Sequence, residues 1–138
     1  MINKKSQIGI EYMLIMAFVT FVLIGIISVA FFYGGGIKDR LKIVQVSNYA
    51  NKIISTVESV HYYGTPSKAT IKVYLPEGIN DIQIIENSLF ITIQLHSGIS
   101  KISFPSDVPV TGSLSTNGGV QRISINAQES GVNLNTLS

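Results

Sequence analysis

The sequence predicts an α+β fold, in which a long hydrophobic N-terminal helix continues into an amphipathic helix packed on a small antiparallel β-sheet head. Three observations lead to this prediction. An apolar run without Asp, Glu, Lys, Arg or His fills residues 12–37, an apolar stripe of helical period follows it, and the period changes to two beyond Pro66. The 138 residues are enough for one modest domain and one additional element.

The composition restricts the classes of function. Charged residues make up 13% of the chain, about half the usual share for soluble domains, and the mean hydropathy of +0.37 is high. Because the chain has no cysteine, disulfides, thiolate metal sites, a cysteine nucleophile and a lipidated cysteine are excluded. Two histidines and eight carboxylates leave little material for a metal centre.

The apolar run is of membrane-spanning length. Met13 to Tyr33 are interrupted only by Thr20, Gly25 and Ser28, and as a helix they span about 30 Å, the thickness of the hydrocarbon core of a bilayer. So short a chain cannot surround such a helix on all sides, so we expect a membrane span. The short basic N-terminus is expected to stay cytoplasmic and the following domain to face outward.

Residues 37–65 are predicted to form an amphipathic helix, either separate from the first or continuous with it. Apolar residues recur at spacings of three and four. Ile37, Leu41 and Val44 form one line, on which Asn48 also falls, and the stripe continues at Val46, Ala50, Ile53, Val57 and Val60. Gly34-Gly35-Gly36 precede this helix, either as a simple linker or as a site where the helix unwinds. Gly64-Thr65-Pro66 end it.

Residues 66–138 are predicted to form the head, an antiparallel meander with one face covered by the amphipathic helix. Apolar and polar residues alternate around Ile71, Val73 and Leu75, from Leu89 to Leu95, at Ile123 and Ile125, and at Val132 and Leu134. Turn-forming segments separate these runs, among them Glu86-Asn87-Ser88 and His96-Ser97-Gly98. Tyr74 and Phe90 fall on the opposite faces of their strands, where they either contact other subunits or are partly covered.

The residues before the apolar run form a specific pattern. They read Lys4-Lys5-Ser6-Gln7-Ile8-Gly9-Ile10-Glu11-Tyr12. This segment resembles the class III signal peptide of archaeal type IV pilin-like proteins, in which basic residues and a small residue precede a glutamine, with a glutamate at the fifth mature position. The Glu11-Tyr12 pair is also similar to that of bacterial Flp pilins. The specific motif covers about twelve residues, and Ser6 stands where glycine is commoner.

The resemblance implies a processing and assembly pathway. A prepilin peptidase would recognise Lys4, Lys5, Ser6 and Gln7 and remove a leader of residues 1–6. Residues 7–36 would then be retained as the hydrophobic N-terminal helix, in the membrane before assembly and in the filament core afterwards. Glu11 and Tyr12 would act in assembly, Glu11 by pairing with the α-amine of Gln7 on a neighbouring subunit. The partners are further copies of the chain, the peptidase and the pilus assembly machinery, and adhesion is the expected task.

Other functions have weaker support. No catalytic or metal-ligand constellation is present, so we expect no enzyme activity and no cofactor. Lys38, Arg40 and Lys42 adjoin the membrane end of the helix and suit lipid head groups better than nucleic acid. The alternatives are an uncleaved single-span membrane protein with an extracytoplasmic β-rich binding domain, a minor pilin or pseudopilin, and a secreted protein cleaved after Ser28-Val29-Ala30.

Overall fold

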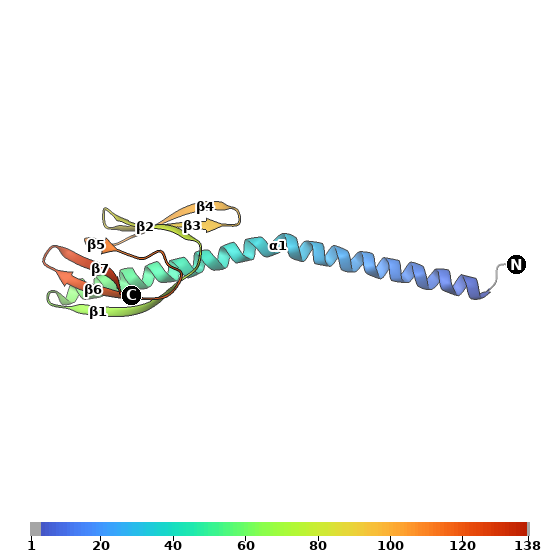
Figure 1. Ribbon diagram of the computed structural model, residues 1–138, viewed down its shortest axis with the longest axis horizontal. Helices are drawn as coiled ribbons and strands as arrows, with labels where there is room; N and C mark the ends of the chain where they lie inside the picture. Colours follow the sequence, from blue (N-terminus) through green and yellow to red (C-terminus); the bar gives the residue numbers. More distant parts are fainter. Residues whose placement is uncertain (1–3, 138) are drawn as a thin grey trace. The chain divides into compact units, whose positions relative to one another are not determined.

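One helix and seven strands make up the described part of the chain. The computed structural model describes the backbone from Lys4 to Leu137 and the side chains from Ile8 to Leu137. Helix α1 (Lys4–Tyr63) comes first (Figure 1). The strands are β1 (Lys68–Leu75), β2 (Ile79–Ile85), β3 (Ser88–Leu95), β4 (Gly98–Pro105), β5 (Val110–Ser113), β6 (Gly119–Gln128) and β7 (Gly131–Leu137). The chain divides into two compact units at the boundary between Ile37 and Lys38.

The two predicted helices are one continuous element. Helix α1 continues without a break through Gly34-Gly35-Gly36, so the second helix is a continuation of the first. Each glycine costs a helix about 1 kcal/mol relative to alanine, but the flanking turns are already helical, and the triplet requires no new nucleation. A Cβ atom added at Gly34 or Gly36 would meet no atom within 4 Å other than those of the adjacent residues and the surrounding helix backbone.

The head contains two sheets. Strands β1, β6, β7 and β5, in that order, form a four-stranded sheet, and β2, β3 and β4 form a three-stranded antiparallel meander. The prediction of a single antiparallel sheet therefore misses a second sheet and one parallel pair, because β5 runs parallel to β7. The segment after β4 takes the chain from the meander to the other sheet, where β5 joins the free edge of β7 in the same direction as β7.

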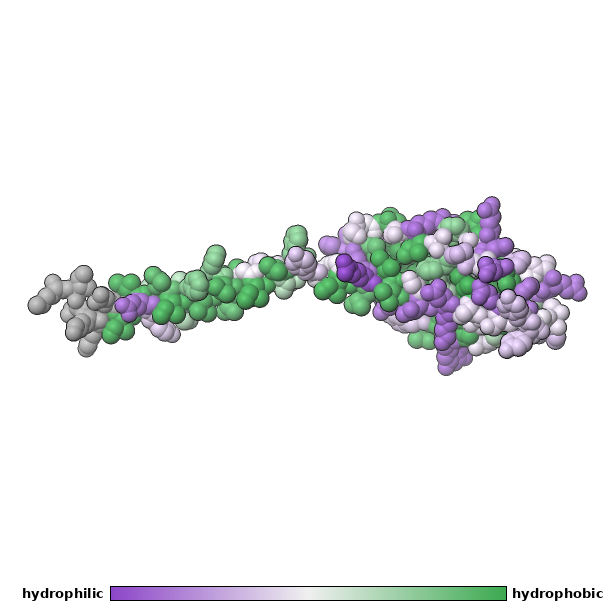
Figure 2. All heavy atoms as spheres, turned by 180° about the vertical axis from the view of Figure 1, so that it is seen from behind, coloured by the Kyte–Doolittle hydropathy of each residue, from purple (hydrophilic) through white to green (hydrophobic). Residues whose placement is uncertain are grey.

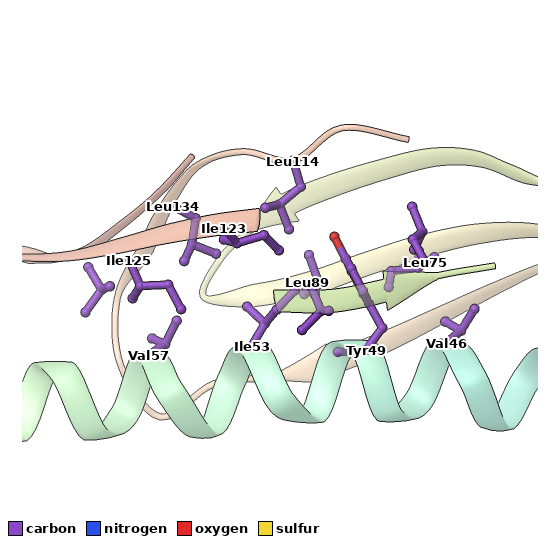
Figure 3. Packing of buried hydrophobic residues seen from close by; sticks show 14 of the residues in the cluster. Val46, Tyr49, Ile53, Val57, Leu75, Leu89, Leu114, Ile123, Ile125 and Leu134 are labelled. Atoms are coloured by element: carbon purple, nitrogen blue, oxygen red, sulfur yellow. The ribbon is translucent and has the colours of Figure 1, made fainter. Parts of the chain in front are cut away.

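The core lies between the C-terminal part of α1 and both sheets. As predicted, Val46, Ala50, Ile53, Val57 and Val60 are buried, and so are the inward residues of the predicted strands, among them Leu75, Ile91, Ile123 and Leu134. Figure 3 shows Val46, Tyr49, Ile53 and Val57 extending from the helix toward strand residues. Burial of this stripe is the main force that attaches the sheets to the helix.

Some side chains lie elsewhere than the sequence pattern suggests. Ile37, Leu41 and Val44 are 55–59% exposed, so this line of the predicted stripe is not packed against the described residues of the chain. The buried face instead includes Tyr49, whose hydroxyl donates a hydrogen bond to Oε1 of Gln121 at 3.2 Å. Burial raises the pKa of the Tyr49 hydroxyl.

Tyr74 and Phe90, the two aromatic residues on the outward strand faces, differ in exposure. Tyr74 is 52% exposed. Phe90 is half-buried, and Nζ of Lys101 lies 4.8 Å from the centre of its ring. Phe90 is therefore covered in part by its own sheet, whereas Tyr74 presents its ring to solvent.

The two faces of α1 can be compared with one valine-to-alanine substitution on each. Val57→Ala removes a fully buried side chain and is expected to lower the free energy of unfolding of the head by about 2 kcal/mol. Val44→Ala, at a side chain that is 55% exposed on the same helix, is expected to change it by less than about 0.5 kcal/mol. Denaturant unfolding in nonionic detergent measures both values, and equal losses would contradict the assigned core.

Candidate functional site: an apolar helix left uncovered by its own chain

The N-terminal part of α1 is apolar around its whole circumference. All twenty large hydrophobic side chains from Ile8 to Ile37 are exposed, from 41% for Val22 to 85% for Phe32. In Figure 2 this segment is largely green over the face in view. A helix that is apolar on every side requires an apolar environment on every side, and the described residues of this chain do not supply one.

The free-energy cost of exposing these side chains to water is too large for the helix to remain uncovered. Each large apolar side chain left in water costs about 1.5–3 kcal/mol relative to burial. Summed over this segment, the cost reaches tens of kcal/mol, several times the ~5–15 kcal/mol by which a domain is stable. The helix is also long and apolar enough to cross a membrane. It can therefore anchor the chain in a bilayer.

The polar side chains inside the apolar segment are already satisfied. Oγ1 of Thr20 donates a hydrogen bond to the carbonyl oxygen of Met16, and Oγ of Ser28 donates to that of Ile24, both at 2.8 Å. Neither hydroxyl needs an external partner in lipid or in a protein interface. No charged side chain interrupts the segment between Glu11 and Lys38.

The predicted assembly residues lie near the start of this segment. Glu11 and Tyr12 are consecutive residues of α1, both exposed. The predicted processing residues Lys4, Lys5, Ser6 and Gln7 belong to the backbone of α1, and their side chains lie outside the described residues. The processing and assembly roles of all six residues stay predictions.

The apolar surface continues beyond a membrane-spanning length. Leu41 and Val44 are more than half exposed, and they follow Ile37 at spacings of four and three, which places the three side chains on one face. Lys38 and Arg40 are interspersed with them along the chain. This second surface is a stripe rather than a full circumference, because the sheets cover the other side of α1 here.

A charged contact ties α1 to the turn between β3 and β4. Oδ1 of Asp39 accepts a hydrogen bond from the backbone N–H of His96 at 2.8 Å, and Oδ2 accepts from N–H and Oγ of Ser97, both at 3.1 Å. One turn further along α1, Nζ of Lys42 donates to the carbonyl oxygen of Gln94 at 2.9 Å. The hydrogen bond from the His96 N–H, together with those from Ser97, lowers the pKa of the Asp39 carboxyl. The sequence did not predict this contact, because Asp39 lies off the apolar stripe and belongs to no motif that would indicate its partner.

The described residues contain no group of three or more His, Asp or Glu side chains placed to hold a metal ion. His61 and His96, the two histidines of the chain, are both exposed and lie in different elements. The apolar helix is a candidate functional surface because its large side chains are exposed on every side.

Comparison with known proteins finds no counterpart. No family model, curated protein or solved structure matches this chain.

The contact at Asp39 predicts a local pH dependence. Because the pKa of Asp39 is lower in the folded state, the ionised carboxyl stabilises its contact with the turn at His96 and Ser97 above the ordinary pKa of 3.8. This stabilisation is lost as the pH falls through the lower folded-state pKa. We expect the amide resonances of His96 and Ser97 to stay constant near neutral pH and to shift only as the pH falls below the ordinary carboxyl pKa of 3.8. NMR of the full chain in detergent measures these shifts.

The matched variant for this titration is Asp39→Asn, which retains one acceptor oxygen but carries no charge to titrate. The two amide resonances should then lose most of their dependence on acid. An equally large acid shift in this variant would assign the titration to another group.

Proposed function

We propose that this chain is the structural subunit of an archaeal type IV-like surface pilus. A prepilin peptidase cleaves before Gln7, the mature subunits polymerise through α1, and the filament serves adhesion. One observation carries the proposal: the N-terminal part of α1 is exposed on every side, while the head closes a core of its own. The apolar side chains of this helix are removed from water only when lipid or other subunits surround the helix.

A helix of this kind suits two successive environments. Lipid covers the apolar circumference before assembly, and sister helices cover it in the filament. Exchanging one for the other replaces lipid contacts with close side-chain packing and leaves no apolar surface in water. The internally satisfied hydroxyls of Thr20 and Ser28 permit the same segment to occupy both environments.

The stripe beyond the span favours a protein partner in addition to lipid. Leu41 and Val44 are more than half exposed and follow the apolar run in sequence. The charged residues Lys38, Asp39 and Arg40 separate them from that run, so a neighbouring subunit is a better cover for them than the hydrocarbon core of a bilayer.

Cleavage before Gln7 changes the charge balance of the helix. It removes Lys4 and Lys5, which leaves eight basic and eight acidic side chains, and it creates a free α-amine. An unpaired carboxylate in a helix bundle costs several kcal/mol, so Glu11 pairs with this amine on a neighbour. Because the pair forms at only one relative position of two subunits, it sets their axial register.

A single-span membrane anchor is the second candidate function. The length of the apolar segment favours it, because lipid alone can cover residues 13–33. In that case the leader is retained, Glu11 remains at the membrane interface, and the head acts as a binding domain outside the membrane. A minor pilin or pseudopilin shares the cleavage step with the main proposal and differs in abundance within the filament.

The N-terminal residue of the native protein separates these functions. Mass spectrometry of the protein recovered from its cell envelope is expected to show a chain that begins at Gln7 and retains the apolar helix. A chain with residues 1–6 still attached would support the membrane anchor, and a chain beginning at Phe31 would indicate a secreted protein. Either of these outcomes contradicts the pilus proposal.

A substitution at Glu11 tests the assembly step. Glu11→Ala is expected to insert into the membrane normally but to reduce the yield of sheared filaments by about tenfold or more, because the α-amine loses its partner. Glu129→Ala, which removes an exposed carboxylate from the turn between β6 and β7, is the matched control and should assemble normally. Filament yield at the wild-type level in Glu11→Ala would remove the assembly role of this residue.

A further inference from the structure

The outer face of the four-stranded sheet has an unusual charge distribution. None of its strands, β1, β6, β7 and β5, contains an aspartate or a glutamate. The inward side chains of these strands, such as Val73, Ile123 and Leu134, are buried in the core. Because side chains alternate along a strand, the intervening residues lie on the other face. These outward residues are Lys68, Thr70, Lys72, Tyr74, Val120, Arg122, Ser124, Asn126, Thr111, Ser113, Asn133, Asn135 and Leu137.

Two of the cations on this face are direct cross-strand neighbours. Lys72 of β1 is paired in register with Arg122 of β6, and both side chains are exposed. Like charges placed opposite each other in a sheet destabilise it. The acidic residues nearest in sequence, Glu77 and Glu129, lie in the loops at the ends of these strands rather than within them. An anion bound at the pair would turn this repulsion into attraction.

The rest of the face offers neutral hydrogen-bonding groups. Nδ2 of Asn135 donates to Oδ1 of Asn133 at 2.8 Å, and Nδ2 of Asn133 donates to Oγ1 of Thr111 at 3.4 Å. These contacts hold the amides in a row across β7 and β5. A hydroxyl-rich ligand has many possible partners on such a surface.

A recess adjoins this face at the edge formed by β1. It has a volume of about 240 Å³ and lies between α1 and β1. Its lining comprises Gln45, Asn48, Tyr49, Lys52, Lys72, Val73 and Tyr74, with no acidic residue among them. Lys72 belongs to both the face and the recess, so a ligand on one can extend into the other. The half-exposed ring of Tyr74 provides a flat apolar platform beside these cations.

We propose that this face and recess bind an acidic polysaccharide. Lys72, Arg122 and Lys52 bind its carboxylate or sulfate groups, the amides and hydroxyls of β5–β7 bind its sugar hydroxyls, and Tyr74 packs against a sugar ring. The neutral rows favour a polyhydroxylated ligand over nucleic acid, whose binding relies on phosphate contacts. This inference rests on the proposed adhesive role of the pilus for its biological meaning, and it names the chemistry to which the filament adheres.

The test is a binding measurement with the full chain in nonionic detergent. The probes are alginate, which carries carboxylates, dextran sulfate, which carries sulfates, and uncharged dextran. We expect binding to one or both of the acidic polymers and none to dextran, and the tighter acidic probe identifies the preferred acid group. Absence of binding to both acidic polymers, or equally tight binding to double-stranded DNA, would overturn the proposal.

Matched double variants locate the site. Lys72→Gln with Arg122→Gln is expected to weaken binding by about tenfold or more, whereas Lys101→Gln with Arg40→Gln, which removes the same net charge elsewhere, should change it less than about twofold. Equal weakening by both pairs would mean attraction by net charge alone and would overturn the assigned site. Circular dichroism checks folding, and Lys72→Arg, which keeps the charge, should retain binding.

Filament measurements on the same variants separate this inference from the proposed function. The mature chain of the double variant Lys72→Gln, Arg122→Gln should still begin at Gln7. It should also assemble into filaments at the wild-type level, because neither residue belongs to the apolar helix. Wild-type filaments that bind neither acidic polymer would overturn the inference and leave the pilus proposal standing. An uncleaved membrane protein that binds them through Lys72 and Arg122 would overturn the pilus proposal and leave the binding face standing.

Discussion

The need of the apolar helix for an external cover governs the organisation of this protein. The large side chains from Ile8 to Ile37 are exposed on every side, and no other described residue of the chain packs over them. Their transfer to water would cost more than the whole stability of a small domain. Membrane insertion, helix–helix assembly, or the two in succession are the physical solutions, and the head must be stable without help from this segment.

The head meets this requirement by using a different part of the same helix. From Val46 to Val60 only one side of α1 is apolar and buried, and both sheets close over it. Near the start of this unit, Asp39 binds the turn that joins β3 and β4, and Lys42 binds the carbonyl oxygen of Gln94 near the end of β3. One uninterrupted helix thus changes from an all-round apolar surface to a one-sided one, with Lys38, Asp39 and Arg40 at the transition.

Much of the fold follows from periodicity alone. The apolar run, the stripe from Val46 to Val60 and the inward residues of four strands, β1, β3, β6 and β7, are all predicted by the sequence, because burial on one face imposes a fixed spacing of apolar residues. The exposure of Leu41 and Val44 cannot be predicted from the sequence. An apolar stripe has the same spacing whether it packs against another part of the chain or against a separate partner. The parallel pairing of β5 is also hidden, since Val110-Thr111-Gly112-Ser113 is short and its direction is set by the connection from β4.

The candidate functional residues also divide into those that local sequence predicts and those whose contacts depend on the fold. Glu11, Tyr12 and the apolar helix follow from local sequence, because a carboxylate beside an apolar run is unusual wherever it occurs. The Asp39 contact and the cationic pair of Lys72 and Arg122 join residues about fifty positions apart. Their partners depend on strand register, which the sequence specifies only through the packed core.

The most direct test of the central claim is a benzophenone side chain placed at Phe18, in the middle of the apolar helix, and activated by light in whole cells. Benzophenone captures whatever C–H group packs against it, so it reports the cover of the helix. The account predicts that sheared surface material contains this chain cross-linked to a second copy of itself through the N-terminal helices. Cross-links to lipid alone, with all of the protein retained in the membrane fraction, would contradict it.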